Sequence, residues 1–162
     1  MAPDQEKKHW VFRVGVADRA GALTSIASAF SNRGISIDTV VGHGAAYTAT
    51  HDGAVVVTFW CTEEEKDEFV RVVKRLSKVT HLEEHPYDSE SLRKSAVVHT
   101  TRRLTPRDVA GRETFLTCEL MKEERGVFTY FLAGSPSELD PILSRLAEEG
   151  ILRDVVYSVI GL

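Results

Sequence analysis

The chain opens with a segment in which large apolar residues occupy every second position. These residues are Trp10, Phe12, Val14 and Val16. Because successive side chains of a β-strand point to opposite faces of a sheet, this alternation predicts a strand with one buried face. After this strand the apolar spacing becomes that of a helix, from Gly21 to Arg33, and Gly34 is its expected C-terminal stop. The apolar stripe of this helix is expected to contain Leu23, Ile26, Ala27 and Phe30.

The next part of the chain repeats the same kinds of pattern. Alternating residues predict a half-buried strand, with Ile35, Ile37, Thr39 and Val41 as its partly buried positions. The segment 54–62 is almost continuously apolar, which is typical of a central strand. Thr62 and Glu65 form a capping-box pattern that predicts a helix over 62–78. An edge-type strand follows and is expected to end at Pro86.

The predicted order of the first half is therefore strand, helix, strand, strand, helix, strand. This βαββαβ order is the ferredoxin-like split βαβ pattern, an α+β fold. Its topology places the first and third strands in the centre of the sheet, and these are the two most apolar strands of the sequence. The agreement between pattern and topology supports a first domain over residues 8–87.

The second half predicts a smaller α+β domain over residues 95–162, after a polar connector at 87–94. Strands are expected at 96–104, 113–122, 127–133 and 151–160, with a helix at 137–149. About eight residues separate the first two of these strands, whereas a helical crossover needs roughly ten or more. The second domain is therefore predicted to be a truncated ferredoxin-like fold that lacks its first helix.

Composition narrows the class of protein. With 43% hydrophobic residues and a formal net charge of -4, the 162-residue chain predicts a globular protein that does not bind nucleic acid. Its apolar runs are too short to span a membrane, and no signal peptide is recognisable at the N-terminus. Cys61 and Cys118 fall in predicted strands, so both are expected to be buried free thiols of a cytoplasmic protein.

The junction between the first strand and the first helix is the strongest candidate for a binding site. The first turn of a helix leaves backbone N–H groups without intrahelical partners at the positive end of the dipole, where a carboxylate or phosphate fits. Gly21 would allow a ligand to approach the backbone closely. Asp18 would either cap the helix or receive an ammonium group. The spacing alone leaves open a simple turn with no ligand.

The residues from Val14 to Val40 resemble the opening of an ACT domain, the small-molecule sensing module of amino-acid metabolism. In particular they are similar to the regulatory small subunits of acetohydroxyacid (acetolactate) synthase. The resemblance rests on an acidic residue followed by Gly-Ala-Leu, on Phe-Ser-x-Arg-Gly at the helix end, and on the start of the next strand. The matching residues are Asp18, Gly21, Ala22, Leu23, Phe30, Ser31, Arg33, Gly34, Ser36 and Ile37.

The resemblance implies a non-catalytic regulatory subunit that forms a homodimer through its ACT domains and has no cofactor of its own. Its partner would be the catalytic large subunit of a thiamine-diphosphate-dependent synthase of branched-chain amino acid biosynthesis. A small amino-acid effector such as valine would bind at the dimer interface. The implied effector-binding residues are Asp18, Arg19, Ala20, Gly21, Ala22, Leu23, Ser36 and Ile37. The alternative is a stand-alone ACT-type amino-acid sensor or interaction module with a different client protein.

Two positions depart from the family pattern. Asp18 and Ser36 stand where the family carries asparagine, so a negative charge lies near the effector carboxylate and one polar side chain is shorter. The expected consequence of these departures is weaker valine binding, a different ligand or a loss of feedback. In the family the C-terminal domain helps to engage the catalytic subunit, a role that the truncation leaves open here.

Other candidate sites are weaker. His81 and His85 lie in a predicted strand, where a spacing of four residues separates them by about 13 Å, so no metal site is expected. His43 and His51 flank a Gly-rich loop and are candidates for contact with a ligand or partner. Paired catalytic carboxylates, a nucleophile elbow and a Gly-rich phosphate motif are all absent from the sequence, which predicts no catalytic residues and no enzyme activity.

Overall fold

The structure is a computed structural model that describes residues 6–17, 20–46, 48–49, 51–110 and 116–161. The chain divides into two compact units, residues 1–89 and residues 90–162. The first unit contains β1 (Lys8–Val16), α1 (Ala22–Asn32), β2 (Ile37–His43), β3 (Gly53–Cys61), α2 (Glu63–Val73) and β4 (Val79–Pro86). The second contains β5 (Leu92–Thr100), β6 (Thr117–Glu124), β7 (Val127–Gly134), α3 (Pro136–Glu148) and β8 (Leu152–Gly161).

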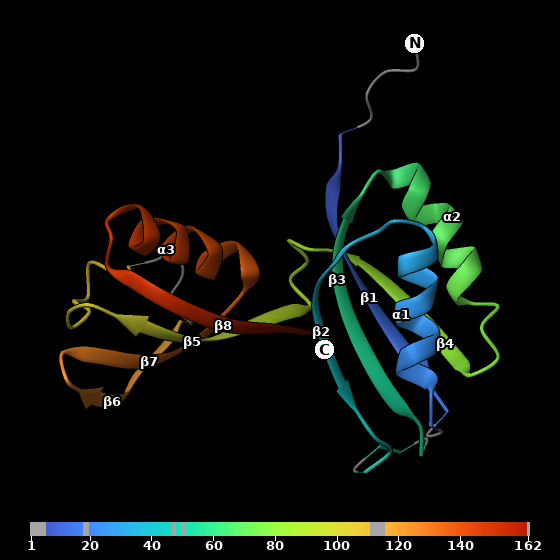
Figure 1. The fold of residues 1–162 in the computed structure, drawn as a ribbon, viewed down its shortest axis with the longest axis horizontal. Helices are drawn as coiled ribbons and strands as arrows, with labels where there is room; N and C mark the ends of the chain where they lie inside the picture. Colours follow the sequence, from blue (N-terminus) through green and yellow to red (C-terminus); the bar gives the residue numbers. More distant parts are fainter. Residues whose placement is uncertain (1–5, 18–19, 47, 50, 111–115, 162) are drawn as a thin grey trace. The chain divides into compact units, whose positions relative to one another are not determined.

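The first unit is an antiparallel sheet with α1 and α2 on one face (Figure 1). Its strand order is β2-β3-β1-β4, so the two most apolar strands are central. The predicted ferredoxin-like fold of this half is confirmed. Helix α2 begins with the predicted capping box, because the Thr62 hydroxyl accepts the N–H of Glu65 and the Glu65 carboxylate accepts the N–H of Thr62.

Four phenylalanine rings fill the space between this sheet and its helices. Phe12 comes from β1, Phe59 from β3, Phe30 from α1 and Phe69 from α2, and none is more than 1% exposed. Phe59 meets Phe12 and Phe30 edge-on, with ring centroids 4.7 and 4.9 Å apart. Such T-shaped pairs match the positive edge of one ring to the negative face of another. The cluster joins both helices to the two central strands and so holds α1 in place.

Strand β2 departs from the simple alternation that its sequence predicts. Its pairing with β3 shifts register between Ile37 and Thr39. Ile37 lies opposite Phe59 on the helix-covered face, whereas Thr39 lies opposite Thr58, whose hydroxyl accepts the N–H of Thr39 at 3.0 Å. Directly opposed residues share a face, so the expectation that Ile37, Thr39 and Val41 share one is wrong. The irregularity moves Thr39 and Val41 to the open face, the face without helices.

The second unit repeats the strand order of the first, and its described residues form one helix in place of two. Its order is β6-β7-β5-β8, and α3 covers one face (Figure 1). Between β5 and β6 the described residues form turns and no helix, which agrees with the predicted truncation. Strand β5 begins at Leu92 and ends at Thr100, earlier at both ends than predicted. The predicted polar connector therefore contributes its last residues to a strand, because Leu92 and Lys94 are buried in the sheet.

A bidentate ion pair orders the loop that replaces the missing helix. Arg102 donates from both terminal nitrogens to the Asp108 carboxylate, at 2.8 and 2.9 Å. Thr105 donates to the same carboxylate from its N–H and its hydroxyl. The guanidinium and these donors hold the pKa of the Asp108 carboxyl well below its usual range. The loop also donates the N–H of Leu104 to the hydroxyl of Tyr130 in the core.

Replacing Asp108 with asparagine is expected to lower the free energy of unfolding at neutral pH by about 1–3 kcal/mol, because a buried acceptor of several donors is lost. The pKa of the Asp108 carboxyl is lower in the folded chain than in the unfolded chain, where it is near 4. Its contribution to the free energy of unfolding is therefore fully present above about pH 4 and is lost as the pH falls through the folded-state pKa. The difference between variant and wild type should therefore narrow as pH falls below about 4. Urea unfolding across this range measures it, with exposed Asp154→Asn as the control. A difference independent of pH would contradict the assignment.

The missing helix also leaves strand β6 uncovered. Cys118 lies opposite Leu132 and Leu120 lies opposite Tyr130, so both point to the same face as the core. They are nevertheless exposed, as is Met121. The expectation that Cys118 is buried is therefore wrong. Cys61 is buried as predicted, burial raises the pKa of its thiol to about 11, and both cysteines are free.

Candidate functional site

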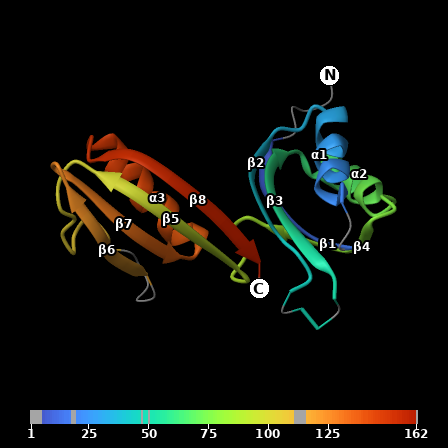
Figure 2. The same ribbon diagram turned by 60° about the horizontal axis from the view of Figure 1, so that its bottom comes forward.

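A cavity of about 370 Å³ lies between the end of β1, the start of α1 and the hairpin that joins β2 to β3. Figure 2 shows this hairpin at one end of the first sheet. Apolar side chains form part of the cavity wall: Val16, Ala22, Leu23 and Val55. We call this cavity the helix-face cavity. Its wall suits a ligand with a small aliphatic part.

The start of α1 supplies polar groups to the helix-face cavity. Gly21 occupies the N-cap position with φ of 83°, a conformation that glycine adopts without steric cost. Having no side chain, it leaves the first-turn N–H groups without a hydrogen bond from this position. The Lys78 ammonium lies close by and donates to the Ala20 carbonyl at 2.7 Å. Lys78 itself lines a neighbouring cavity, which shares Gly21 with this one. The first-turn N–H groups and the positive end of the helix dipole attract a carboxylate to the helix-face cavity, with the ammonium group at its edge.

The hairpin side of the cavity is built from glycine. Gly42, Gly44 and Gly53 line it together with His43. A Cβ atom at Gly53 would lie 2.7 Å from the His43 carbonyl oxygen, so a side chain there would force the two strands apart. The Nδ1 atom of His43 lies 2.9 Å from the carbonyl oxygen of Gly44. The two strands thus lie close together at this end of the sheet. Because the glycines carry no side chains, a ligand in the cavity can lie directly against their main-chain atoms.

The structure brings some of the sequence-predicted site residues together and separates others. Gly21, Ala22 and Leu23 line the helix-face cavity, and Ala20 carries the carbonyl that Lys78 contacts. Asp18 and Arg19 lie outside the described residues. Ser36 and Ile37 lie at the start of β2, whereas the cavity is at its end, about 20 Å away along a strand of this length. Within one chain, the two predicted parts of the site are therefore apart.

Two sequence expectations about α1 change. The sequence predicts Leu23 on the buried stripe, but Leu23 is 51% exposed, and Ala22 and Ala29 take part in the core in its place. The buried residues are spaced i, i+4, i+7 and i+8 from Ala22, so Leu23 lies beside this stripe, where it lines the helix-face cavity. Sequence reasoning also missed Lys78, which is 58 residues from Ala20 along the chain. Only its place just before β4 could have indicated it, because β4 pairs with β1.

The two histidines in β4 lie close to a shared carboxylate. Glu83 lies between them: His81 Nε2 is 2.7 Å and His85 Nε2 is 3.8 Å from its carboxylate oxygens. Arg13 contacts the same carboxylate at 3.2 Å. Among the described residues there is no group of three or more histidines, cysteines and acidic residues that could hold a metal ion. Over the same residues, no helix combines the length and apolar character needed to cross a bilayer.

Comparison with known proteins identifies the fold. No protein-family model and no curated protein sequence matches the chain. The chain is similar to the crystal structure of the acetolactate synthase small subunit from Thermotoga maritima, with a TM-score of 0.69 and 12% identity over 96% of each chain. The ligand-free regulatory subunit of aspartate kinase from Thermus thermophilus is also similar, with a TM-score of 0.45 and 14% identity over 87% of this chain and 93% of that one. The first likeness extends over both units and confirms the predicted α+β, ferredoxin-like fold.

Proposed function

We propose that the chain is a non-catalytic regulatory subunit that binds a small amino acid, such as valine, in the helix-face cavity. The observation that carries the proposal is the junction of aliphatic side chains with the start of α1. The α-carboxylate would accept hydrogen bonds from the first turn of α1 beside Lys78. An aliphatic side chain would lie against Val16, Leu23 and Val55. A small aliphatic amino acid would therefore contact both the start of α1 and the aliphatic wall of the cavity.

A two-fold dimer through β2 would complete this site. Strand β2 lies at the edge of the first sheet, and the strand with which it pairs among the described residues is β3. When two copies of an edge strand pair antiparallel about a two-fold axis, the start of one lies beside the end of the other. Ser36 and Ile37 of the second copy would then lie near the helix-face cavity of the first. An interface of this kind requires the two predicted parts of the site to lie apart within one chain, because each half-site combines one part from each copy.

The two edges of the first sheet differ in a way that favours β2 as the interface. The outer strand β4 carries charged and imidazole side chains and ends in Pro86, features that discourage pairing with another sheet. Strand β2 carries mainly apolar and small residues, and its one acidic residue, Asp38, lies 3.3 Å from His9. Val40 on this strand is 46% exposed, and Leu23 on α1 is also exposed. Pairing would cover both.

The client that we propose is an acetohydroxyacid synthase-like enzyme that depends on thiamine diphosphate, in the cytoplasm. The thiamine diphosphate belongs to that enzyme, and the chain itself would need no cofactor. In the family that the sequence resembles, the C-terminal domain helps to engage the catalytic subunit. The exposed Leu120 and Met121 of β6 offer the second unit an apolar surface for this contact. The effector would regulate the enzyme only if it binds two arrangements of the complex with different affinities.

Calorimetry with valine, leucine and isoleucine tests the site. Leu23→Asp is expected to weaken binding about tenfold or more relative to Leu23→Asn, because a carboxylate about 4 Å from the ligand carboxylate costs roughly 1–4 kcal/mol. Both variants lose the same apolar side chain, so their difference isolates the charge. The fold should tolerate either, since an acidic residue suits the first turn of a helix. Equal affinities of the two variants would show that the carboxylate lies elsewhere.

A second measurement tests the client. The chain alone should form no acetohydroxy acid, and addition of the chain should change the rate of the large subunit from the same organism. Absence of a complex between the two, with amino-acid binding intact, would favour the stand-alone sensor with another client. Failure of the wild type to bind any of the three amino acids would reject valine-type sensing itself.

A further inference from the structure

A second and larger cavity lies on the open face of the first sheet. Its volume is about 700 Å³, against about 370 Å³ for the helix-face cavity. Arg13 and Gly15 of β1 and Thr80 and His81 of β4 form its floor. We call it the open-face cavity. The sequence pattern gives no sign of it, because its floor comes from residues that alternate with the buried core.

The loop between β2 and β3 closes one side of the open-face cavity. Thr48, Ala49 and Asp52 of this loop line the cavity together with His43, the last residue of β2. The Thr48 hydroxyl donates to the Ala45 carbonyl at 2.8 Å, which holds the loop in a turn. The cavity is therefore bounded by regular strands below and by a hydrogen-bonded loop at the side.

Arg13 presents donors that no described residue accepts. Its Nη1 atom lies 3.2 and 3.3 Å from the two oxygens of Glu83. The Nε and Nη2 atoms have no acceptor among the described residues, and the side chain is 35% exposed. Since a guanidinium carries five N–H donors in a planar fork, most of this fork is left for an acceptor in the cavity.

Asp52 presents the opposite charge. Among the residues that the structure describes, none donates a hydrogen bond to its carboxylate or forms an ion pair with it. His43 adds a further acceptor: its Nδ1 lies 2.9 Å from the Gly44 carbonyl, so in the neutral ring Nδ1 is the donor and Nε2 keeps a lone pair. One cation and one anion thus line the same cavity, each with hydrogen-bonding capacity unused.

We propose that the open-face cavity binds a small zwitterion, with the ligand's carboxylate on Arg13 and its ammonium group on Asp52. A free amino acid is the commonest molecule of this class. A simple anion would leave Asp52 without a partner and would lie near its charge. A simple cation would leave the Nε and Nη2 donors of Arg13, which do not contact Glu83, without an acceptor. Only a ligand with both charges satisfies both side chains.

This site is separate from the one in the proposed function and does not rest on it. The two cavities lie on opposite faces of the first sheet and share only His43 and Gly53 as lining residues. His81 lines the open-face cavity alone, so its ring signals in a nuclear magnetic resonance spectrum report this site specifically. His43 lines both and would connect them.

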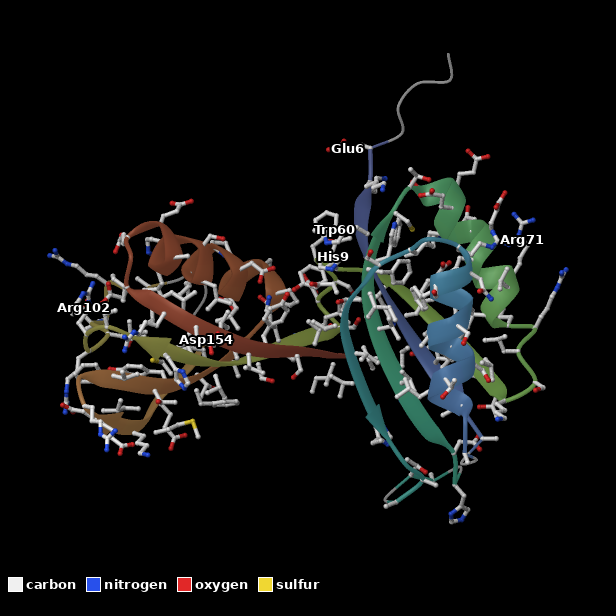
Figure 3. The ribbon with its side chains drawn as sticks, in the orientation of Figure 1. Glu6, His9, Trp60, Arg71, Arg102 and Asp154 are labelled. Atoms are coloured by element: carbon white, nitrogen blue, oxygen red, sulfur yellow. The ribbon has the colours of Figure 1, made fainter. Side chains whose placement is uncertain are left out.

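The experiment titrates the full chain with a panel of common L-amino acids at millimolar concentration and follows the ring protons of His81. At least one amino acid is expected to shift these signals. Arg13→Met and Asp52→Asn should each weaken that binding about tenfold or more, because each removes a charge-assisted contact. Arg71→Met serves as the control, since Arg71 lies on the exposed face of α2 (Figure 3). Analogues of the same amino acid that lack the amino group or the carboxylate should bind the wild type weakly. Their affinity should be no higher than that of the amino acid itself for Arg13→Met or Asp52→Asn.

The outcomes are separable from those of the helix-face site. Leu23→Asp should leave the His81 shifts unchanged while it weakens binding in the other cavity. The proposal is overturned if no amino acid shifts His81, if neither Arg13→Met nor Asp52→Asn weakens the shift, or if an analogue with a single charge binds as well as the zwitterion. Backbone amide spectra of the variants verify that each is folded. Asp52→Asn changes a loop residue outside the strands and is the variant least able to disturb the fold.

Discussion

Replacing Phe59 with alanine is expected to lower the free energy of unfolding of the first unit by about 3–5 kcal/mol. Phe59 is fully buried on the central strand β3 and meets the rings of Phe12 and Phe30 edge-on, at 4.7 and 4.9 Å. The alanine would remove these contacts and leave a cavity between the sheet and both helices, which the surrounding rings can fill only in part. The same change would loosen α1 and so disturb the helix-face cavity.

Tryptophan fluorescence during urea unfolding measures this effect in the first unit specifically. The chain has two tryptophans, Trp10 and Trp60, and both lie in that unit. In Figure 3, Trp60 lies beside His9, and the two rings stack with centroids 4.3 Å apart. Phe59→Leu is the matched control, because a change that nearly conserves volume should cost less than about 1.5 kcal/mol. A loss of less than 1 kcal/mol in Phe59→Ala would mean that the four rings do not form the core described here.

Replacing Val40 with lysine is expected to dissociate the proposed dimer, with a rise of about a hundredfold in its dissociation constant. Val40 lies in the middle of the edge strand β2 and is 46% exposed, so two copies would meet close to the two-fold axis. Two lysines there would place like charges beside each other and remove apolar area from the interface. A hundredfold change corresponds to about 2.7 kcal/mol. The monomer should also bind the amino-acid effector weakly, since half of the site would be missing.

Sedimentation over a range of concentrations measures this effect. Val156→Lys is the control, because it adds the same charge at a position that is 71% exposed on a strand of the second unit, β8. At the same micromolar concentration, the wild type and Val156→Lys should both be dimers. Val40→Lys should be a monomer. A dimer that survives Val40→Lys and is lost in Val156→Lys would place the interface on the second unit.

Much of the fold follows from local signals in the sequence. The alternation at residues 10–16 predicts β1, the apolar run at 54–62 predicts β3, and the capping box at Thr62 and Glu65 predicts the start of α2. Gly34 predicts the end of α1, and its φ of 65° shows why glycine suits that place. These signals are reliable because each depends on neighbours within a few residues, and because the order of elements then allows few topologies.

The candidate site follows from the sequence only in part. The motif at Gly21 to Leu23 indicates the start of α1 as a binding place, and the structure puts a cavity there. The sequence does not indicate Lys78, which reaches Ala20 only because β4 pairs with β1. Nor does it indicate that Ser36 lies at the other end of β2 from this cavity, since that distance depends on the direction of the strand.

The sequence by itself determined the element order and the ferredoxin-like topology, because hydrophobic period and caps are properties of the local chain. It also predicted, from segment length, that the described residues between β5 and β6 form no helix. The tertiary structure alone decided which face each residue of β2 takes, because the register shift after Ile37 depends on the pairing with β3. It alone exposed Cys118, since a residue on the core side of a sheet is buried only if a helix lies above it. It alone placed Arg13 and Asp52 around one cavity, because side chains that are distant in sequence share a site only after the strands have paired.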